Sequence, residues 1–198
     1  MPDSLNAGLT FLVSTLFDFS ILVLLLRMIL QWVGANYYDP ISQLIIKLTD
    51  PIILPMRKMV PRFHQMDLSI LILLILLELL KLLCLIGLQA GMLPNFFGLF
   101  IWSVGDLLNH TVNVFFYCII IMVLMSWFPP GSYSSFVDLL HEITEPLLRP
   151  IRRFMPSLGG FDLSAIPAMI GLKLIAIVLI QPIVRFGVVM AIGSTMPL

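Results

Sequence analysis

The residues in this sequence that can do chemistry are ionisable side chains set inside long apolar stretches. Five of them lie well inside those stretches, namely Asp18, Arg27, Glu78, Lys81 and Lys173. An unpaired charge inside a membrane is costly, so such residues mark either contacts between helices or a polar path. We expect these side chains to hold helices together, and a proton or ion pathway is the alternative.

The chain contains two copies of one sequence pattern, and ionisable residues at equivalent positions in the two copies are candidates for contact. When the chain is shifted by 95 positions, Glu78 falls on Lys173 and Asp18 falls on Asn113. Residues at equal depth in a duplicated membrane protein can meet on the axis that relates the copies. We therefore predict that Glu78 and Lys173 share a salt bridge or a hydrogen bond. Lys81 is the competitor, because it lies three positions after Glu78 on the same helical face.

Other kinds of chemistry lack their sequence signatures. The three histidines, His64, His110 and His141, lie in separate segments, while Cys84 and Cys118 lie in apolar stretches, where packing is their expected role. The sequence has no Cys-x-x-Cys-His motif, no Cys and His cluster with metal-ligand spacing, and no phosphate-binding loop or nucleophile motif. We therefore expect no catalytic residue, no metal site, no cofactor and no enzymatic activity.

The composition requires lipid or other helices around most of the surface. Of the 198 residues 60% are hydrophobic and 11% are charged, whereas a soluble domain has about 25% charged residues. The formal net charge is zero, and the few Lys and Arg residues are too scattered for a nucleic-acid footprint. The start of the chain lacks the basic region and cleavage site of a secretory signal, so we expect the first apolar stretch to remain as a helix.

Four apolar stretches are long enough to cross a bilayer as helices, which takes about 20 residues. They cover approximately residues 5–33, 68–90, 97–128 and 163–191. Residues 95–110 leave two alternatives open, a separate hairpin-like segment or the start of one long third helix. The predicted fold class is an all-α polytopic membrane protein with about four transmembrane helices.

Basic residues gather in two segments between the spans, residues 34–67 and 129–162. By the positive-inside rule both segments face the cytoplasm, so both termini face the periplasm of a bacterial inner membrane. Asp67 and Asp162 end these segments, and an acid there suits the first turn of the next span. Arg27 lies close enough to the cytoplasmic end for its side chain to reach the interface.

The same shift relates the two halves of the chain at polar positions as well as apolar ones. Repeat one covers residues 1–93 and repeat two covers residues 94–198. The matched pairs include Thr49 with Thr144, Pro51 with Pro146, Pro55 with Pro150, Arg57 with Arg152, Pro61 with Pro156 and Asp67 with Asp162. Each copy holds two spans, so the copies must be parallel and related by a pseudo-two-fold axis along the membrane normal.

Each basic segment has the pattern of an amphipathic element interrupted by prolines. A threonine before the first proline, Thr49 or Thr144, can cap a second short helix in which that proline occupies the first turn. The second proline, Pro55 or Pro150, then prevents a long regular helix. The result should be a bent element lying in the membrane interface. Its basic residues are expected to bind anionic lipid or a partner, and they are Arg57, Lys58, Arg149, Arg152 and Arg153.

The repeated block resembles the bacterial YggT family, whose relatives include the YlmG proteins and a plastid factor. Its most specific stretches are Pro146–Arg153 and Gly159–Asp162, and the resemblance covers nearly the whole chain. Repeat one departs from the motif, since Leu54 stands where repeat two has Arg149. The resemblance implies an integral membrane protein with no catalytic residues to inherit. It also implies links to cell division and osmotic-stress tolerance in bacteria, and to assembly of a membrane cytochrome complex in plastids.

Two functional hypotheses from different classes follow. The first is a non-enzymatic membrane scaffold or assembly factor that presents its basic, proline-rich elements to anionic lipid head groups and to membrane proteins of unknown identity. The alternative is an ion transporter or channel component in osmotic adjustment, favoured by the polar residues inside the spans. Four spans enclose little volume, and mid-membrane Gly or Pro breaks are not paired between the copies. Formation of a homo-oligomer would weaken that objection.

Overall fold

The computed structural model describes residues 2–35, 38–58, 67–90, 93–126, 135–153 and 164–193. Its elements in chain order are α1 (Pro2–Val33), α2 (Pro40–Arg57), α3 (Leu68–Ala90), α4 (Phe96–Met125), α5 (Ser135–Arg152), α6 (Ala165–Ile175), a π-helical turn (Ala176–Ile180) and α7 (Gln181–Ile192). These ranges contain no strand. The protein therefore has the all-α fold that the sequence predicts.

Four helical stretches are long and apolar enough to cross a membrane, which confirms the predicted number of spans. They are Ser4–Val33, Leu68–Gln89, Phe96–Met125 and Ala165–Ile192. Large apolar side chains remain exposed along all four of them. Lipid tails can cover such a surface, whereas water would penalise it. The chain is therefore a multi-pass membrane protein.

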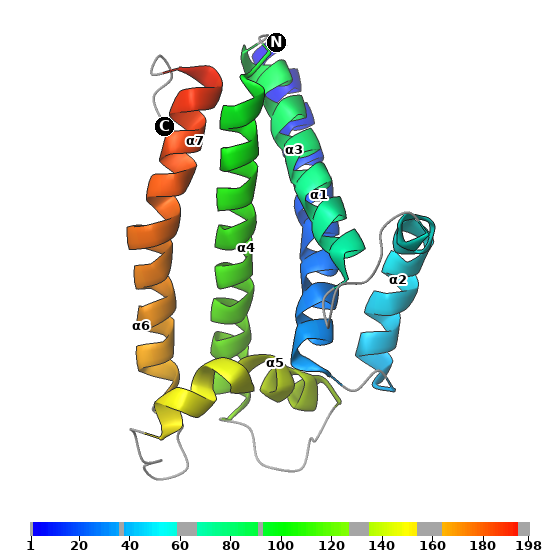
Figure 1. The fold of residues 1–198 in the computed structure, drawn as a ribbon, viewed down its shortest axis with the longest axis vertical. Helices are drawn as coiled ribbons and strands as arrows, with labels where there is room; N and C mark the ends of the chain where they lie inside the picture. Colours follow the sequence, from blue (N-terminus) through cyan, green and yellow to red (C-terminus); the bar gives the residue numbers. More distant parts are fainter. Residues whose placement is uncertain are drawn as a thin grey trace.

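The two halves of the chain run through the bundle in the same direction. In Figure 1, α1 and α4 both lead to the end of the molecule at which α5 lies, and α3 and α6 lead back toward the opposite end. The start of α1 and the end of α7 lie at that opposite end (Figure 1). Within the bundle α1 packs against α3, and α4 packs against both α6 and α7. This is the arrangement expected of two parallel copies of one unit.

The third span is a single helix, so the second of the two alternatives for residues 95–110 is correct. Asn95 caps it by accepting a hydrogen bond from the Phe97 N–H at 3.0 Å. Glycine lets α4 approach α7 closely, because a Cβ placed on Gly98 would lie 2.2 Å from the backbone nitrogen of Ala191. Small residues allow the same backbone-to-backbone contact between helices in other membrane proteins.

The prediction that prolines break the two amphipathic segments is wrong. α2 and α5 each continue for 18 residues with both prolines inside the helix. Thr49 and Thr144 do not start a new helix, because their hydroxyls donate to carbonyls four residues earlier, at 2.6 Å and 2.8 Å. All four prolines, Pro51, Pro55, Pro146 and Pro150, lie on exposed faces. The carbonyls that lose a partner there are not sealed in the core, while the buried opposite face holds the helix in place.

The two amphipathic helices occupy different places, although the sequence predicts equivalent ones. α5 lies across the end of the bundle, whereas α2 lies beside α1 and α3 (Figure 1). α5 buries Leu140, Ile143 and Leu148 and turns its charged side chains outward. α2 buries Ile45 and Ile53 on one side. On another side α2 exposes three large apolar residues, Leu44, Leu48 and Ile52. One-sided amphipathic character therefore belongs to α5 alone.

The fourth span contains a π-helical turn at its centre. The Gln181 N–H bonds to the carbonyl of Ala176, five residues earlier. Pro182 explains the turn, because it has no N–H to donate to Val178 and so interrupts the α-helical ladder. The equivalent position in repeat one is Gly87, and α3 passes through it as a regular helix. The break is therefore not paired between the copies.

Candidate functional site

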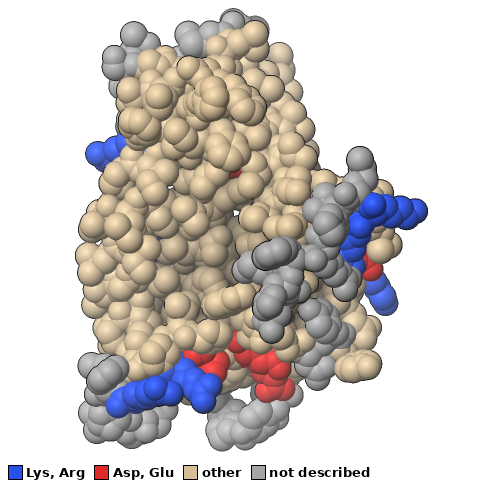
Figure 2. Space-filling model, viewed as in Figure 1, with Lys and Arg blue, Asp and Glu red and all other residues tan. Residues whose placement is uncertain are grey.

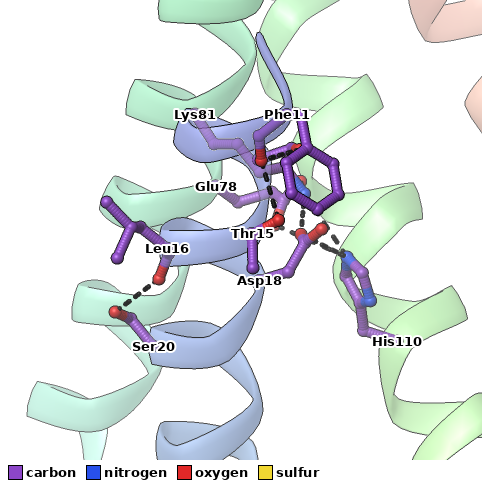
Figure 3. Close-up of polar contacts among 9 residues, drawn as sticks. Phe11, Thr15, Leu16, Asp18, Ser20, Glu78, Lys81 and His110 are labelled. Carbon is purple, nitrogen blue, oxygen red and sulfur yellow. Dashed lines mark hydrogen bonds and ion pairs between the residues drawn. The ribbon is translucent and has the colours of Figure 1, made fainter. Parts of the chain in front are cut away.

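Four ionisable side chains from three helices meet inside the spans. Asp18 comes from α1, Glu78 and Lys81 come from α3, and His110 comes from α4 (Figure 3). The Lys81 Nζ lies 3.0 Å from Asp18 Oδ1 and 2.5 Å from Glu78 Oε1. The His110 Nε2 lies 3.9 Å from both carboxylates and 3.4 Å from Lys81 Nζ. We refer to these four residues as the charged cluster.

Burial within the charged cluster increases toward α3. The Glu78 side chain is fully buried and that of Lys81 is 7% exposed, whereas those of Asp18 and His110 are 48% and 33% exposed. Glu78 Oε2 has no hydrogen-bond donor among the described residues. The cluster is therefore closed on the α3 side and open on the side of α1 and α4.

Sequence reasoning did not count His110 among the ionisable residues well inside the apolar stretches and so missed its place in the charged cluster. A signal was present, because Asp106 and His110 are four residues apart and such residues share one helical face. Asp106 hydrogen-bonds to Trp102, one turn earlier on α4, and lies near enough to Lys81 for their charges to interact. It adds a third carboxyl group to the surroundings of Lys81.

The predicted contact between Glu78 and Lys173 is wrong. Glu78 pairs with Lys81 on its own helix, while the Lys173 Nζ lies 3.1 Å from Asn113 Oδ1 and 4.2 Å from the ring centre of Phe116. The reason is that α3 packs against α1 and α6 packs against α4. Each lysine consequently meets a polar residue of the first span in its own repeat, and Lys173 does not reach Glu78.

The expectation that Arg27 reaches the lipid interface is also wrong. Its side chain is 8% exposed, and its guanidinium lies 2.7 Å from Asp50 Oδ1 on α2. It also donates to the Ile46 carbonyl at 3.1 Å and to the Thr49 hydroxyl. These contacts fix α2 to the end of α1.

Repeat two has a neutral version of the same contact. Met122 stands where repeat one has Arg27, and Thr144 stands where it has Thr49. The Thr144 hydroxyl lies 3.2 Å from the sulfur of Met122. The duplicated helices thus keep the contact and change its chemistry.

A second ion pair joins the end of α2 to the start of α3. The Arg57 Nε donates to Asp67 Oδ2 at 2.6 Å, and Asp67 Oδ1 accepts from the Ser69 N–H at 3.2 Å. Burial by itself would raise the pKa of Asp67. The hydrogen bond and charge of Arg57, with the bonds from Ser69, outweigh burial and hold the pKa below its usual value. Arg57 is therefore engaged by the protein, while its neighbour Lys58 is exposed.

The charged face of α5 is the other concentration of polar groups. Its members are Asp138, His141, Glu142, Glu145, Arg149, Arg152 and Arg153. The acids occupy the first half and the arginines the second, and Figure 2 shows blue and red side chains next to each other along the lower edge of the molecule. Arg152 bonds to Glu145 at 2.7 Å, whereas Arg149 and Arg153 are exposed.

An open pocket of about 600 Å³ lies where the starts of α2 and α5 meet. Its polar lining includes Asp39, Ser135, Asp138, His141 and Glu142. Asp39 also caps α2 by accepting from the Ile41 and Ser42 N–H groups. The pocket continues the acidic half of the charged face of α5.

Some of the expected site residues lie outside the described part of the chain, namely Pro61, Pro156 and Asp162. Within the described part, Cys84 and Cys118 are free thiols. No group of three His, Cys, Asp or Glu side chains in that part is arranged to hold a metal ion. The described residues thus bring together one cluster inside the spans and one charged face at the α5 end.

The sequence profile of the CCB3/YggT family matches the chain twice, over residues 6–88 and 101–183. The two matched segments begin 95 residues apart, which is the offset that relates the two repeats. No solved structure matches this chain at a significant level.

Curated bacterial proteins are similar to the chain over most of its length. An uncharacterized protein of Pseudomonas aeruginosa is 40% identical over 178 residues, which are 89% of this chain and 90% of that protein. A protein encoded in the proC 3′ region of Vibrio alginolyticus is 36% identical over 167 residues, 84% of this chain and 90% of that protein. The YggT protein of Escherichia coli K12 is 36% identical over 158 residues, 79% of this chain and 80% of that protein.

The profile match includes parts of all four spans and the whole of α2 and α5. Its two halves coincide with the parallel repeats of the structure. The curated relatives agree with it over both halves. The chain belongs to the CCB3/YggT family.

Proposed function

We propose that this protein is a non-enzymatic membrane scaffold or assembly factor that presents the charged face of α5 to a partner protein. The observation that carries the proposal is the one-sided burial of α5. The apolar side of α5 packs against α1, α4 and α6. Its charged side is left outward at the end of the bundle (Figure 2).

The packing of α5 supports a fixed docking surface. Leu140, Ile143, Thr144 and Leu148 are each 3% exposed or less. A helix held at this many points keeps its outward side chains in a constant arrangement, so a partner need not order them on binding. Along α5 acidic residues come first and arginines follow. A partner surface with basic residues opposite the acids and acidic residues opposite the arginines would bind in one orientation.

The basic end of the same face supports a role for anionic lipid in orienting that surface. Arg149 and Arg153 are exposed, and each cation near an anionic membrane surface contributes about 1 kcal/mol of binding free energy. By the positive-inside rule we place the α5 end in the cytoplasm of a bacterial cell, with both termini in the periplasm. Roles in cell-envelope processes and in osmotic-stress tolerance are part of this proposal.

Photo-crosslinking in native membranes tests the scaffold proposal. A crosslinking amino acid replaces His141 on α5 or Arg153 directly after it, and Val178 on the exposed surface of the fourth span serves as the control. We expect one defined protein adduct from the α5 positions and lipid adducts from position 178. With the crosslinker at position 141, the double variant R149E/R153E should lose the protein adduct while keeping its helical circular dichroism. The same set of adducts at all three positions, or no protein adduct from α5, would refute the scaffold.

Passage of an ion is the second candidate function, and the charged cluster is the observation that favours it. Ionisable residues inside spans commonly line ion or proton paths. The unpaired π turn in the fourth span gives that half of the protein an irregular element of the kind found at functional sites. Ion flux into liposomes containing the full-length protein separates this candidate from the scaffold, because a scaffold gives the same flux as empty liposomes.

A further inference from the structure

We propose that the charged cluster is a proton-binding site inside the membrane, with the proton held between Glu78 and His110. This inference goes beyond the scaffold and does not depend on it. Glu78 Oε2 and His110 Nε2 are 3.9 Å apart, so a small side-chain adjustment brings them within hydrogen-bonding distance. The Glu78 side chain is fully buried, and Oε2 has no hydrogen-bond donor among the described residues. A bound proton would supply the missing hydrogen bond.

The net charge of the cluster favours binding of one proton. Lys81 is a single cation shared between the carboxylates of Asp18 and Glu78. With His110 neutral, the four side chains carry one net negative charge. An uncompensated charge away from water is costly, and one proton removes it.

The proton can bind to either partner, and Glu78 Oε2 is the more favourable of the two positions, because His110 Nε2 also lies 3.4 Å from the Lys81 ammonium. On Glu78 Oε2 it forms an O–H group that donates to His110 Nε2. On His110 Nε2 it forms an N–H group that donates to Glu78 Oε2, and the histidinium then also faces Asp18 Oδ1 at 3.9 Å. The two groups share one titration, so the proton belongs to the pair.

The charged groups on every packed element are consistent with this site. α1 contributes Asp18, α3 contributes Glu78 and Lys81, and α4 contributes His110 together with Asp106. The carboxyl of Asp106 also lies near Lys81. The remaining charged side chains on neighbouring helices engage other groups or are exposed, and they are Arg27, Asp50, Arg57, Lys173 and Arg185.

Burial indicates which groups lie between Glu78 and the surface of the bundle. Asp18 and His110 are partly exposed, while Glu78 lies behind them on α3. A proton that reaches Glu78 therefore passes Asp18 and His110. Repeat two holds Asn113 and Lys173 at the positions of Asp18 and Glu78. It has no carboxylate there, so the equivalent positions of repeat two do not form a second site.

Infrared difference spectroscopy on the full-length protein in lipid nanodiscs tests the proposal. A pH step from about 8 to about 5 also protonates ordinary histidines, so the site is read from the part of the wild-type difference spectrum, roughly one proton per chain, that depends on both Glu78 and His110. Glu78→Gln and His110→Gln should each abolish this signal. The matched controls Glu142→Gln and His141→Gln lie on the charged face of α5, and each should remove only its own bands and leave this part of the spectrum in place.

His110→Gln keeps the proposal testable if Glu78→Gln does not fold, because it leaves the Lys81 ion pairs in place. Spectra in which both variants retain the wild-type uptake would overturn the proposal. Suppression of the signal by sodium or potassium chloride, but not by choline chloride, would assign the site to a metal cation and would overturn it as well.

Discussion

Replacing the two partners of the buried ion pair between α1 and α2 should reveal an unequal cost. Arg27 is 8% exposed and Asp50 is 34% exposed. Asp50→Asn leaves the buried guanidinium of Arg27 without its carboxylate partner, which costs about 3 kcal/mol of unfolding free energy. Arg27→Met strands a carboxylate that water can still reach, and methionine already occupies the equivalent position in repeat two, as Met122. We expect that change to cost only about 1–2 kcal/mol.

The double variant R27M/D50N should cost about as much as Arg27→Met alone, which corresponds to a coupling of about 3 kcal/mol. Reversible unfolding of the full-length protein in mixed micelles, followed by helical circular dichroism, measures these differences. Lys47→Met is the matched control, because Lys47 is an exposed cation on α2, and its effect should stay within about 0.5 kcal/mol. Additive effects, or a larger cost for Arg27→Met than for Asp50→Asn, would refute the reasoning.

Three further predictions concern other parts of the molecule. The folded-state pKa of Asp67 is lowered, so its carboxylate stabilises the fold fully above its ordinary pKa of about 4 and loses this effect as the pH falls through the lowered value. The free energy of unfolding, measured against pH, should therefore drop less steeply in acid for Asp67→Asn than for the wild type. Gly187→Val should destabilise the protein by about 1–3 kcal/mol or more, because a Cβ there would lie 2.5 Å from the backbone nitrogen of Trp102. Gly171→Ala, which has open space around it, should be close to neutral in the same unfolding assay, and a neutral Gly187→Val would count against the close packing of α4 on α7. Reporter fusions after Leu93 and Leu198 should both read as periplasmic, and a cytoplasmic reading at either point would reject the proposed orientation.

The sequence is sufficient for the spans and the repeat because both depend on local properties. Length and apolar composition alone predict four membrane helices. The matched prolines and threonines predict the duplication, and the structure places their helices in parallel copies. The sequence does not predict which residue each charged side chain contacts. A shift by the repeat length assigns equal depth to Glu78 and Lys173, but the packing of spans within each repeat decides that Lys173 meets Asn113.

The errors at Arg27 and at the prolines have related causes. The depth of Arg27 in its span favours an interfacial side chain, but α2 brings Asp50 alongside it, and that approach is a tertiary event. The rule that proline ends a helix describes isolated chains well. In α2 and α5 the prolines lie on exposed faces, and burial of the opposite face preserves the helix. Tertiary packing therefore overrides the local preference in both cases.

The π turn gives the fourth span a tolerance that the other spans lack. It contains one residue more than a regular helix needs, and one residue corresponds to about 100° of rotation. The buried residues before the turn include Ala168 and Leu172, and those after it include Gly187 and Ala191. In an uninterrupted α-helix these two sets would point about 100° apart, and the extra residue brings them onto one side. Deleting one residue from Ala176–Ile180 should therefore leave both sets directed at α4, whereas a single deletion in the middle of α3 would turn half of that helix away from its neighbours.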